Sequence, residues 1–120
     1  MNDRVTPEGQ ALGRLSVWME ERGRVRLAPF DLDQFPRTRG EMCASCACRP
    51  GTVPNGCMQT QLDLLKAVVE GVPFLCHAPK DGRMCAGYLR VRAEHVARPI
   101  PKEIEAVVRE WDFSPAEPTP

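Results

Sequence analysis

Cysteine content restricts this chain more than any other feature of its sequence. Six cysteines occur in 120 residues. Met1 to Arg24 contain no apolar stretch of the length that a signal peptide needs, so we expect a cytoplasmic protein. In a reducing compartment, thiols rarely build a framework of disulfides and more often bind a metal or carry redox chemistry. The cysteines therefore predict a metal centre within the fold.

The spacing of the cysteines favours four of them as metal ligands. Cys43 and Cys46 form a C-x-x-C pair in a turn rich in Pro and Gly, from which two thiolates can reach one metal ion. Cys76 ends a short apolar run, Cys85 begins a predicted helix, and the turn between them would fold the second pair back on itself. We therefore predict a site formed by Cys43, Cys46, Cys76 and Cys85.

The predicted ligand set does not identify the metal. Four thiolates suit either tetrahedral Zn²⁺ or a [4Fe-4S] cluster. Cys48 and Cys57 are second choices as ligands, and His77 could replace a thiolate in a Cys3His zinc site. At Cys85, the backbone N–H groups of a helix start would stabilise thiolate charge.

Hydrophobic periodicity predicts an α+β domain in which two or three helices pack on a minimal strand pair beside an irregular Cys-rich loop. Helices are expected from a Thr6-Pro7 start to Gly23, from a Thr60 cap to Gly71, over 86–96, and around 104–111. The short strands are expected at 25–27 and 72–76. Residues 1–113 should form a single domain with a metal-binding core at about 43–97, and 114–120 a Pro-rich disordered tail.

Charge and motifs suggest the class of function. The formal net charge is zero, but basic residues are concentrated before Arg49 and between Lys80 and Arg98. We expect a regulatory or interaction module whose basic faces engage nucleic acid or a nucleic-acid-processing protein, without a membrane. Two alternatives are a redox-responsive [4Fe-4S] sensor or electron carrier and a thiol-dependent enzyme using Cys48 or Cys57. The common catalytic motifs are absent, so we do not expect an enzyme with its own catalytic pocket.

Several short segments between Cys43 and Leu89 resemble a family of small uncharacterised cysteine-rich proteins of bacteria and their phages. The resemblance is carried by Cys43-Ala44-Ser45-Cys46, Arg49-Pro50-Gly51-Thr52, Thr60, Pro73-Phe74-Leu75-Cys76-His77 and Cys85-Ala86-Gly87-Tyr88. It implies that Cys43, Cys46, Cys76 and Cys85 are preferred over Cys48 and Cys57. It also implies roles for His77 and Gly87, but it implies no activity.

Overall fold

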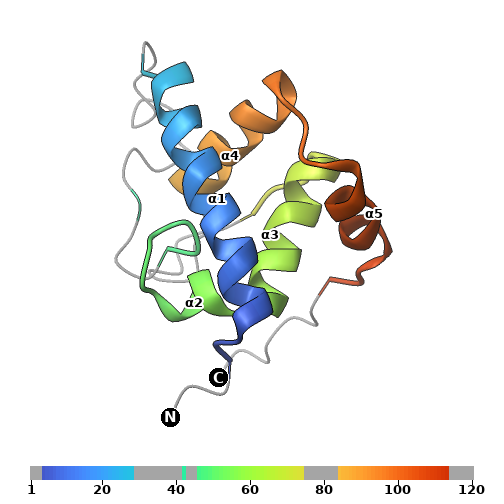
Figure 1. Ribbon diagram of the computed structural model, residues 1–120. Coiled ribbons are helices and arrows are strands. Elements are labelled where there is room, and N and C mark those ends of the chain that lie inside the picture. Colours follow the sequence, from blue (N-terminus) through green and yellow to red (C-terminus); the bar gives the residue numbers. More distant parts are fainter. Residues whose placement is uncertain (1–3, 29–41, 43–45, 75–83, 114–120) are drawn as a thin grey trace.

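A computed structural model describes residues 4–28, 42, 46–74 and 84–113, and this part of the chain is mostly helical (Figure 1). Its helices are α1 (Pro7–Arg26), α2 (Val53–Gly56), α3 (Met58–Glu70), α4 (Ala86–Ala97) and α5 (Lys102–Glu110). Within these ranges an isolated antiparallel bridge joins Val5 and Cys57, Met84 is a further bridge residue, and no sheet forms. The predicted α+β class with a strand pair is therefore wrong.

Neither predicted strand is present in the described residues. The first is absent because α1 is longer than expected. α1 continues through Gly23 and ends at Arg26, with Leu27 as its C-cap. A Cβ atom at Gly23 would lie 1.8 Å from the carbonyl oxygen of Arg90, so this glycine permits close packing of α1 on α4 and does not end the helix. Residues 72–74 form no strand, and the rest of that predicted strand lies outside the described residues.

Several predicted helix ends are confirmed. The Thr6 side chain accepts a hydrogen bond from the Gly9 N–H at 3.0 Å and caps α1, which has Pro7 in its first turn. Gly71 ends α3 in the left-handed conformation, with φ of 72°. The predicted start of α3 is wrong, because Cys57 is its N-cap and Thr60 lies inside its first turn.

The core lies where α1, α4 and α5 pack around α3 (Figure 1). Its largest buried apolar side chains include Met19, Leu64, Leu65, Tyr88 and Val108. Three cysteines belong to the same buried cluster: the predicted ligands Cys46 and Cys85 and the second choice Cys48. Among the described helices, none is long and apolar enough to cross a membrane.

Candidate metal centre

The described residues include four of the six cysteines. Cys46, Cys48, Cys57 and Cys85 are all buried, and none of them forms a disulfide. The remaining predicted ligands, Cys43 and Cys76, lie outside the described residues, as does His77. The structure therefore gives the position of one cysteine from each predicted ligand pair.

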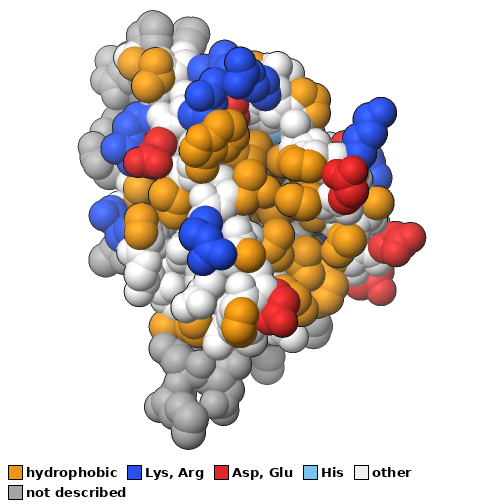
Figure 2. All heavy atoms as spheres, in the orientation of Figure 1, with side chains coloured by type: hydrophobic (Ala, Val, Ile, Leu, Met, Phe, Trp, Pro, Cys, Tyr) orange, Lys and Arg blue, Asp and Glu red, His pale blue; other side chains and the backbone are white. Residues whose placement is uncertain are grey.

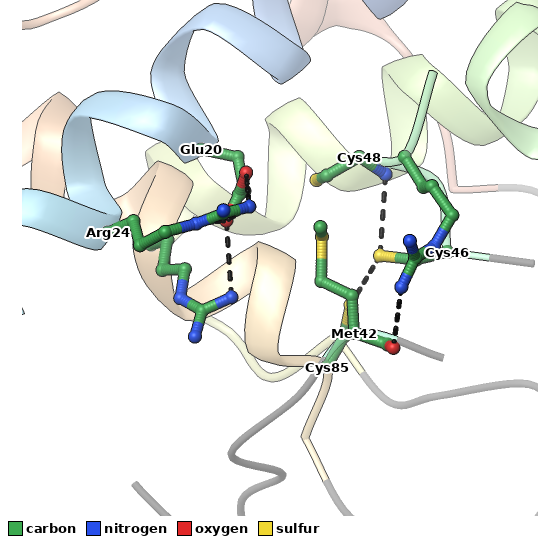
Figure 3. A network of polar contacts seen from close by, with 8 residues as sticks. Glu20, Arg24, Met42, Cys46, Cys48 and Cys85 are labelled. Atoms are coloured by element: carbon green, nitrogen blue, oxygen red, sulfur yellow. Dashed lines mark hydrogen bonds and ion pairs between the residues drawn. The ribbon is translucent and has the colours of Figure 1, made fainter. Parts of the chain in front are cut away.

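Cys46 and Cys85 come together although 39 residues separate them in sequence. Their Sγ atoms lie 3.4 Å apart, and both side chains are buried (Figure 3). Two thiolates that bind one Zn²⁺ tetrahedrally, at about 2.3 Å each, lie about 3.8 Å apart. The two sulfur atoms are therefore at nearly the separation that a single shared metal ion requires.

Cys48 lies beside this pair, and we call Cys46, Cys48 and Cys85 the thiol cluster. The Cys48 N–H donates a hydrogen bond to Cys46 Sγ at 3.4 Å. Hydrogen bonds from the Cys48 and Cys85 thiols outweigh burial and hold the pKa of Cys46 well below its ordinary value. The same hydrogen bond to Cys46, together with burial, raises the pKa of Cys48. The thiol cluster thus favours a thiolate at Cys46, and the thiolate is the form that binds metals.

Gly87, in the first turn of α4, allows the sulfur atoms to approach this helix. A Cβ atom at this position would lie 2.9 Å from Cys48 Sγ and 3.0 Å from Cys46 Sγ. Such contacts are too short for any residue other than glycine unless the sulfur atoms move. The resemblance described above implied a role for Gly87, and this close approach gives a physical reason for one.

Cys85 is the N-cap of α4, as the sequence predicts for the start of a helix. Its backbone N–H donates to the carbonyl oxygen of Phe74 at 3.0 Å. The Leu89 N–H donates to the Cys85 carbonyl oxygen, which starts the hydrogen bonding of the helix. The position of the Cys85 sulfur is therefore set by α4, a rigid element, and by the backbone of Phe74.

Polar side chains from α2 and α3 hold the loop that carries Cys46 and Cys48. The Ala47 carbonyl oxygen accepts hydrogen bonds from Asn55 Nδ2 at 2.8 Å and Gln61 Nε2 at 2.9 Å. Thr52 Oγ1 donates to the Cys46 carbonyl oxygen at 2.9 Å. Sequence reasoning missed these anchors, and the available signal was a glutamine, Gln61, on the otherwise apolar side of α3.

A buried carboxylate lies next to the thiol cluster (Figure 3). Glu20 of α1 pairs with Arg24 at 2.7 Å and with Arg90 at 3.2 Å. The charge of Glu20 contributes to the raised pKa of Cys48, after the Cys46 hydrogen bond and burial, while Arg90 opposes it. The two ion pairs of Glu20 are therefore close enough to the thiol cluster to affect the pKa of Cys48.

A second buried carboxylate binds two more arginines at the contact between α1 and α4. Glu94 is fully buried and pairs with Arg22 at 2.8 Å and Arg26 at 2.7 Å. With the Glu20 pairs, four arginines of the basic groups predicted from the sequence are engaged by internal carboxylates. Their charge is partly neutralised, and part of the predicted basic face serves to join two helices.

Cys57 lies at the start of α3, in a different setting from the thiol cluster. Burial raises the pKa of its thiol, but hydrogen bonds from Thr60 and the nearby Arg4 outweigh burial and lower it overall. His95, the histidine that the structure describes, accepts a hydrogen bond at Nδ1 from the Ile100 N–H at 3.1 Å. This hydrogen bond joins the end of α4 to the segment that precedes α5.

Within the ranges described, no three His, Cys, Asp or Glu side chains are arranged to hold a metal ion. Of the four predicted ligands, the described residues include two, Cys46 and Cys85. Comparison of the chain with protein-family models, with curated proteins and with solved structures found no match.

Proposed function

We propose that this protein binds one metal centre through cysteine thiolates, with Cys46 and Cys85 in the ligand set. The observation that carries the proposal is the 3.4 Å separation of two buried sulfur atoms from distant segments of the chain. Cys43 and Cys76, predicted from the sequence, complete the set of four. Cys48 is the second choice and would take the place of one of these four ligands, because its backbone and its thiol both contact Cys46.

The same separation favours a single zinc ion over an iron–sulfur cluster. In a mononuclear site all thiolates bind one ion, which keeps neighbouring sulfur atoms about 3.8 Å apart. In a [4Fe-4S] cluster each thiolate binds a different iron, which spreads the sulfur atoms farther. The short distance between Cys46 and Cys85 matches the mononuclear case, and we propose Zn²⁺ as the metal.

A closed zinc site of this kind has a structural role. Four protein ligands leave no open position for a substrate, and the free energy of metal binding stabilises the fold. We therefore propose a metal-stabilised regulatory or interaction module. For the thiol-enzyme alternative, burial of both Cys48 and Cys57 is unfavourable, because a nucleophile must reach its substrate.

The test is anaerobic purification followed by metal analysis and an ultraviolet–visible spectrum. We expect about one zinc per chain and no visible absorption band, since Zn²⁺ has a filled d shell. Cys46→Ser and Cys85→Ser should lose most of the metal, whereas the matched control Cys57→Ser should retain it. Cys43→Ser and Cys76→Ser test the other two predicted ligands in the same way.

Two outcomes would contradict the proposal. A visible band that dithionite bleaches would show that the metal centre is an iron–sulfur cluster and not zinc. Mass spectrometry could instead find metal-free protein with a disulfide between Cys46 and Cys85. That result would show that these thiols carry redox chemistry and do not bind a metal. The short distance between these sulfur atoms makes the second outcome a genuine competitor.

A further inference from the structure

A buried polar contact links α1 to the loop that carries two members of the thiol cluster. Figure 2 shows hydrophobic and charged side chains over one face of the molecule, whereas Ser16 of α1 and Gln61 of α3 lie fully beneath the surface. The Ser16 hydroxyl donates a hydrogen bond to Gln61 Oε1. Gln61 Nε2 donates to the carbonyl oxygens of Ala47 and Pro54, each at 2.9 Å. Because a carbonyl oxygen only accepts hydrogen bonds, these contacts fix which end of the Gln61 amide faces the loop.

Asn55 of α2 makes a second contact of the same kind. Its Nδ2 donates to the Ala47 carbonyl oxygen at 2.8 Å and to the Gly13 carbonyl oxygen of α1 at 3.1 Å. The Ala47 oxygen therefore accepts hydrogen bonds from two side-chain amides, although one partner is enough to satisfy a buried carbonyl group. Two donors from different helices fix the direction of this carbonyl group more firmly than one donor would.

The direction of the Ala47 carbonyl group sets the direction of the N–H group that follows it. The Ala47 C=O and the Cys48 N–H belong to one planar trans peptide, so they point in opposite directions. Asn55 and Gln61 hold the oxygen on one side of this peptide. On the other side, the Cys48 N–H donates to Cys46 Sγ at 3.4 Å (Figure 3). The two amides therefore aim a hydrogen bond at the sulfur atom of a proposed metal ligand.

We propose that Asn55 and Gln61 are positioning residues of the metal site, which direct the Cys48 N–H at the Cys46 thiolate. The inference rests on the proposed function and names the groups that tune the site. A hydrogen bond to a thiolate is charge-assisted and offsets part of its negative charge. Groups that orient the ligands of a metal contribute strongly to metal affinity. Ser16 supports this arrangement from α1, because its hydroxyl holds the Gln61 amide in place.

The test measures zinc affinity by competition with a chelator in wild type, Gln61→Leu and Asn55→Ala. Each variant removes one amide donor and should weaken zinc binding by about 10- to 100-fold. Ser16→Ala should weaken it less, because Gln61 keeps its own donors, and this milder variant serves if the others fail to fold by circular dichroism. The control is Lys66→Met, which removes another buried donor of α3, to the Arg109 carbonyl oxygen of α5 at 2.9 Å. It should leave the affinity unchanged.

A second readout separates positioning from a general loss of stability. The chemical shift of the Cys48 amide proton reports its hydrogen bond, and NMR of isotope-labelled protein in excess zinc measures it. The shift should move upfield in Gln61→Leu and Ser16→Ala and stay unchanged in Lys66→Met. Weaker affinity without a change in this shift would overturn the proposal.

The result for wild type distinguishes this inference from the proposed function. A wild-type protein that binds no zinc would overturn the proposed function and this inference with it. A wild-type protein that binds zinc, together with amide variants that bind it equally well, would overturn this inference alone.

Discussion

At the scale of single residues, Gly87 and Glu94 are two positions where the packing requires one particular type of residue. Gly87 keeps α4 free of a side chain where two sulfur atoms approach it. Glu94 places a carboxylate, fully buried, between two arginines of α1. The first residue is required for its size and the second for its charge, and each leads to a separate prediction.

Gly87→Ala should lower both metal content and thermal stability. The new Cβ atom would displace Cys46 and Cys48, whose sulfur atoms lie within 3.0 Å of its position. Overpacking of this kind costs about 1–3 kcal/mol of unfolding free energy. Metal analysis and chemical denaturation measure the two effects. Gly51→Ala is a matched control, because a Cβ there meets nothing within 4 Å, and its positive φ should cost stability without loss of metal.

Glu94→Gln should lower the unfolding free energy at neutral pH by about 2 kcal/mol, because charged hydrogen bonds at a buried site are lost. Burial raises the pKa of Glu94, but the hydrogen bonds from Arg26 and Arg22 outweigh burial and lower the pKa overall below its ordinary value. The contribution of this carboxylate is therefore complete above the ordinary pKa of a glutamate and is lost as the pH falls through the lowered pKa.

Denaturation of wild type and Glu94→Gln at several pH values measures this dependence. The difference between the two proteins should be constant from pH 7 to about 5 and should shrink at lower pH. Glu103→Gln, an exposed substitution on α5, provides the control. A difference that grows as the pH falls would mean that the arginines do not stabilise the Glu94 carboxylate.

At the scale of elements, α1 joins the rest of the fold through small and charged residues. Its buried residues include Gly9, Gly13, Ser16 and Gly23 together with Glu20. These small residues let its backbone approach α2 and α4 closely, and the glutamates of α1 and α4 bind arginines across the contact. The apolar residues Leu12 and Leu15 of α1 are consequently only partly buried, and Trp18 remains exposed.

Gly23→Ala tests whether this close approach decides how α1 is placed. Alanine favours a helix over glycine by about 1 kcal/mol, which taken alone predicts stabilisation. The added Cβ would, however, lie 1.8 Å from the Arg90 carbonyl oxygen, a backbone atom that cannot rotate away. We therefore expect net destabilisation of at least about 2 kcal/mol in chemical denaturation. Stabilisation would mean that α1 and α4 are not in such close contact.

At the scale of the whole molecule, a metal site would join two segments that are distant in the sequence. The loop of Cys46 and Cys48 is fastened to α2 and α3 by Asn55, Gln61 and Thr52. Cys85 belongs to α4, so a shared ion would tie this loop to a different helix. Metal binding should then stabilise the whole fold cooperatively.

Removal of zinc with a chelator should lower the Tm of the wild-type protein. A ligand at 100 times its dissociation constant stabilises the native state by about 2.7 kcal/mol, and that contribution is lost with the metal. Calorimetry before and after chelation, followed by zinc re-addition, measures it. The chelator should leave Cys46→Ser unaffected, because this variant holds little metal. An equal loss of Tm in both proteins would show that the chelator does not act through the cysteine site.

Local rules predicted several features of this protein correctly. The Thr6 cap, the left-handed Gly71 and the helix that begins after Cys85 depend on backbone preferences over a few residues, and sequence reveals these directly. Cysteine spacing also favoured Cys46 and Cys85, the pair that the fold brings together.

Other features depended on neighbours that are distant in the sequence. Whether Gly23 ends a helix or packs against one is settled by the Arg90 backbone across the contact. The arginines that suggested a basic face pair with Glu20 and Glu94, because buried carboxylates require cations. Hydrophobic periodicity predicts which side chains avoid water, but the shapes of the packed surfaces decide which side of a helix is buried. Only the tertiary structure contains that information.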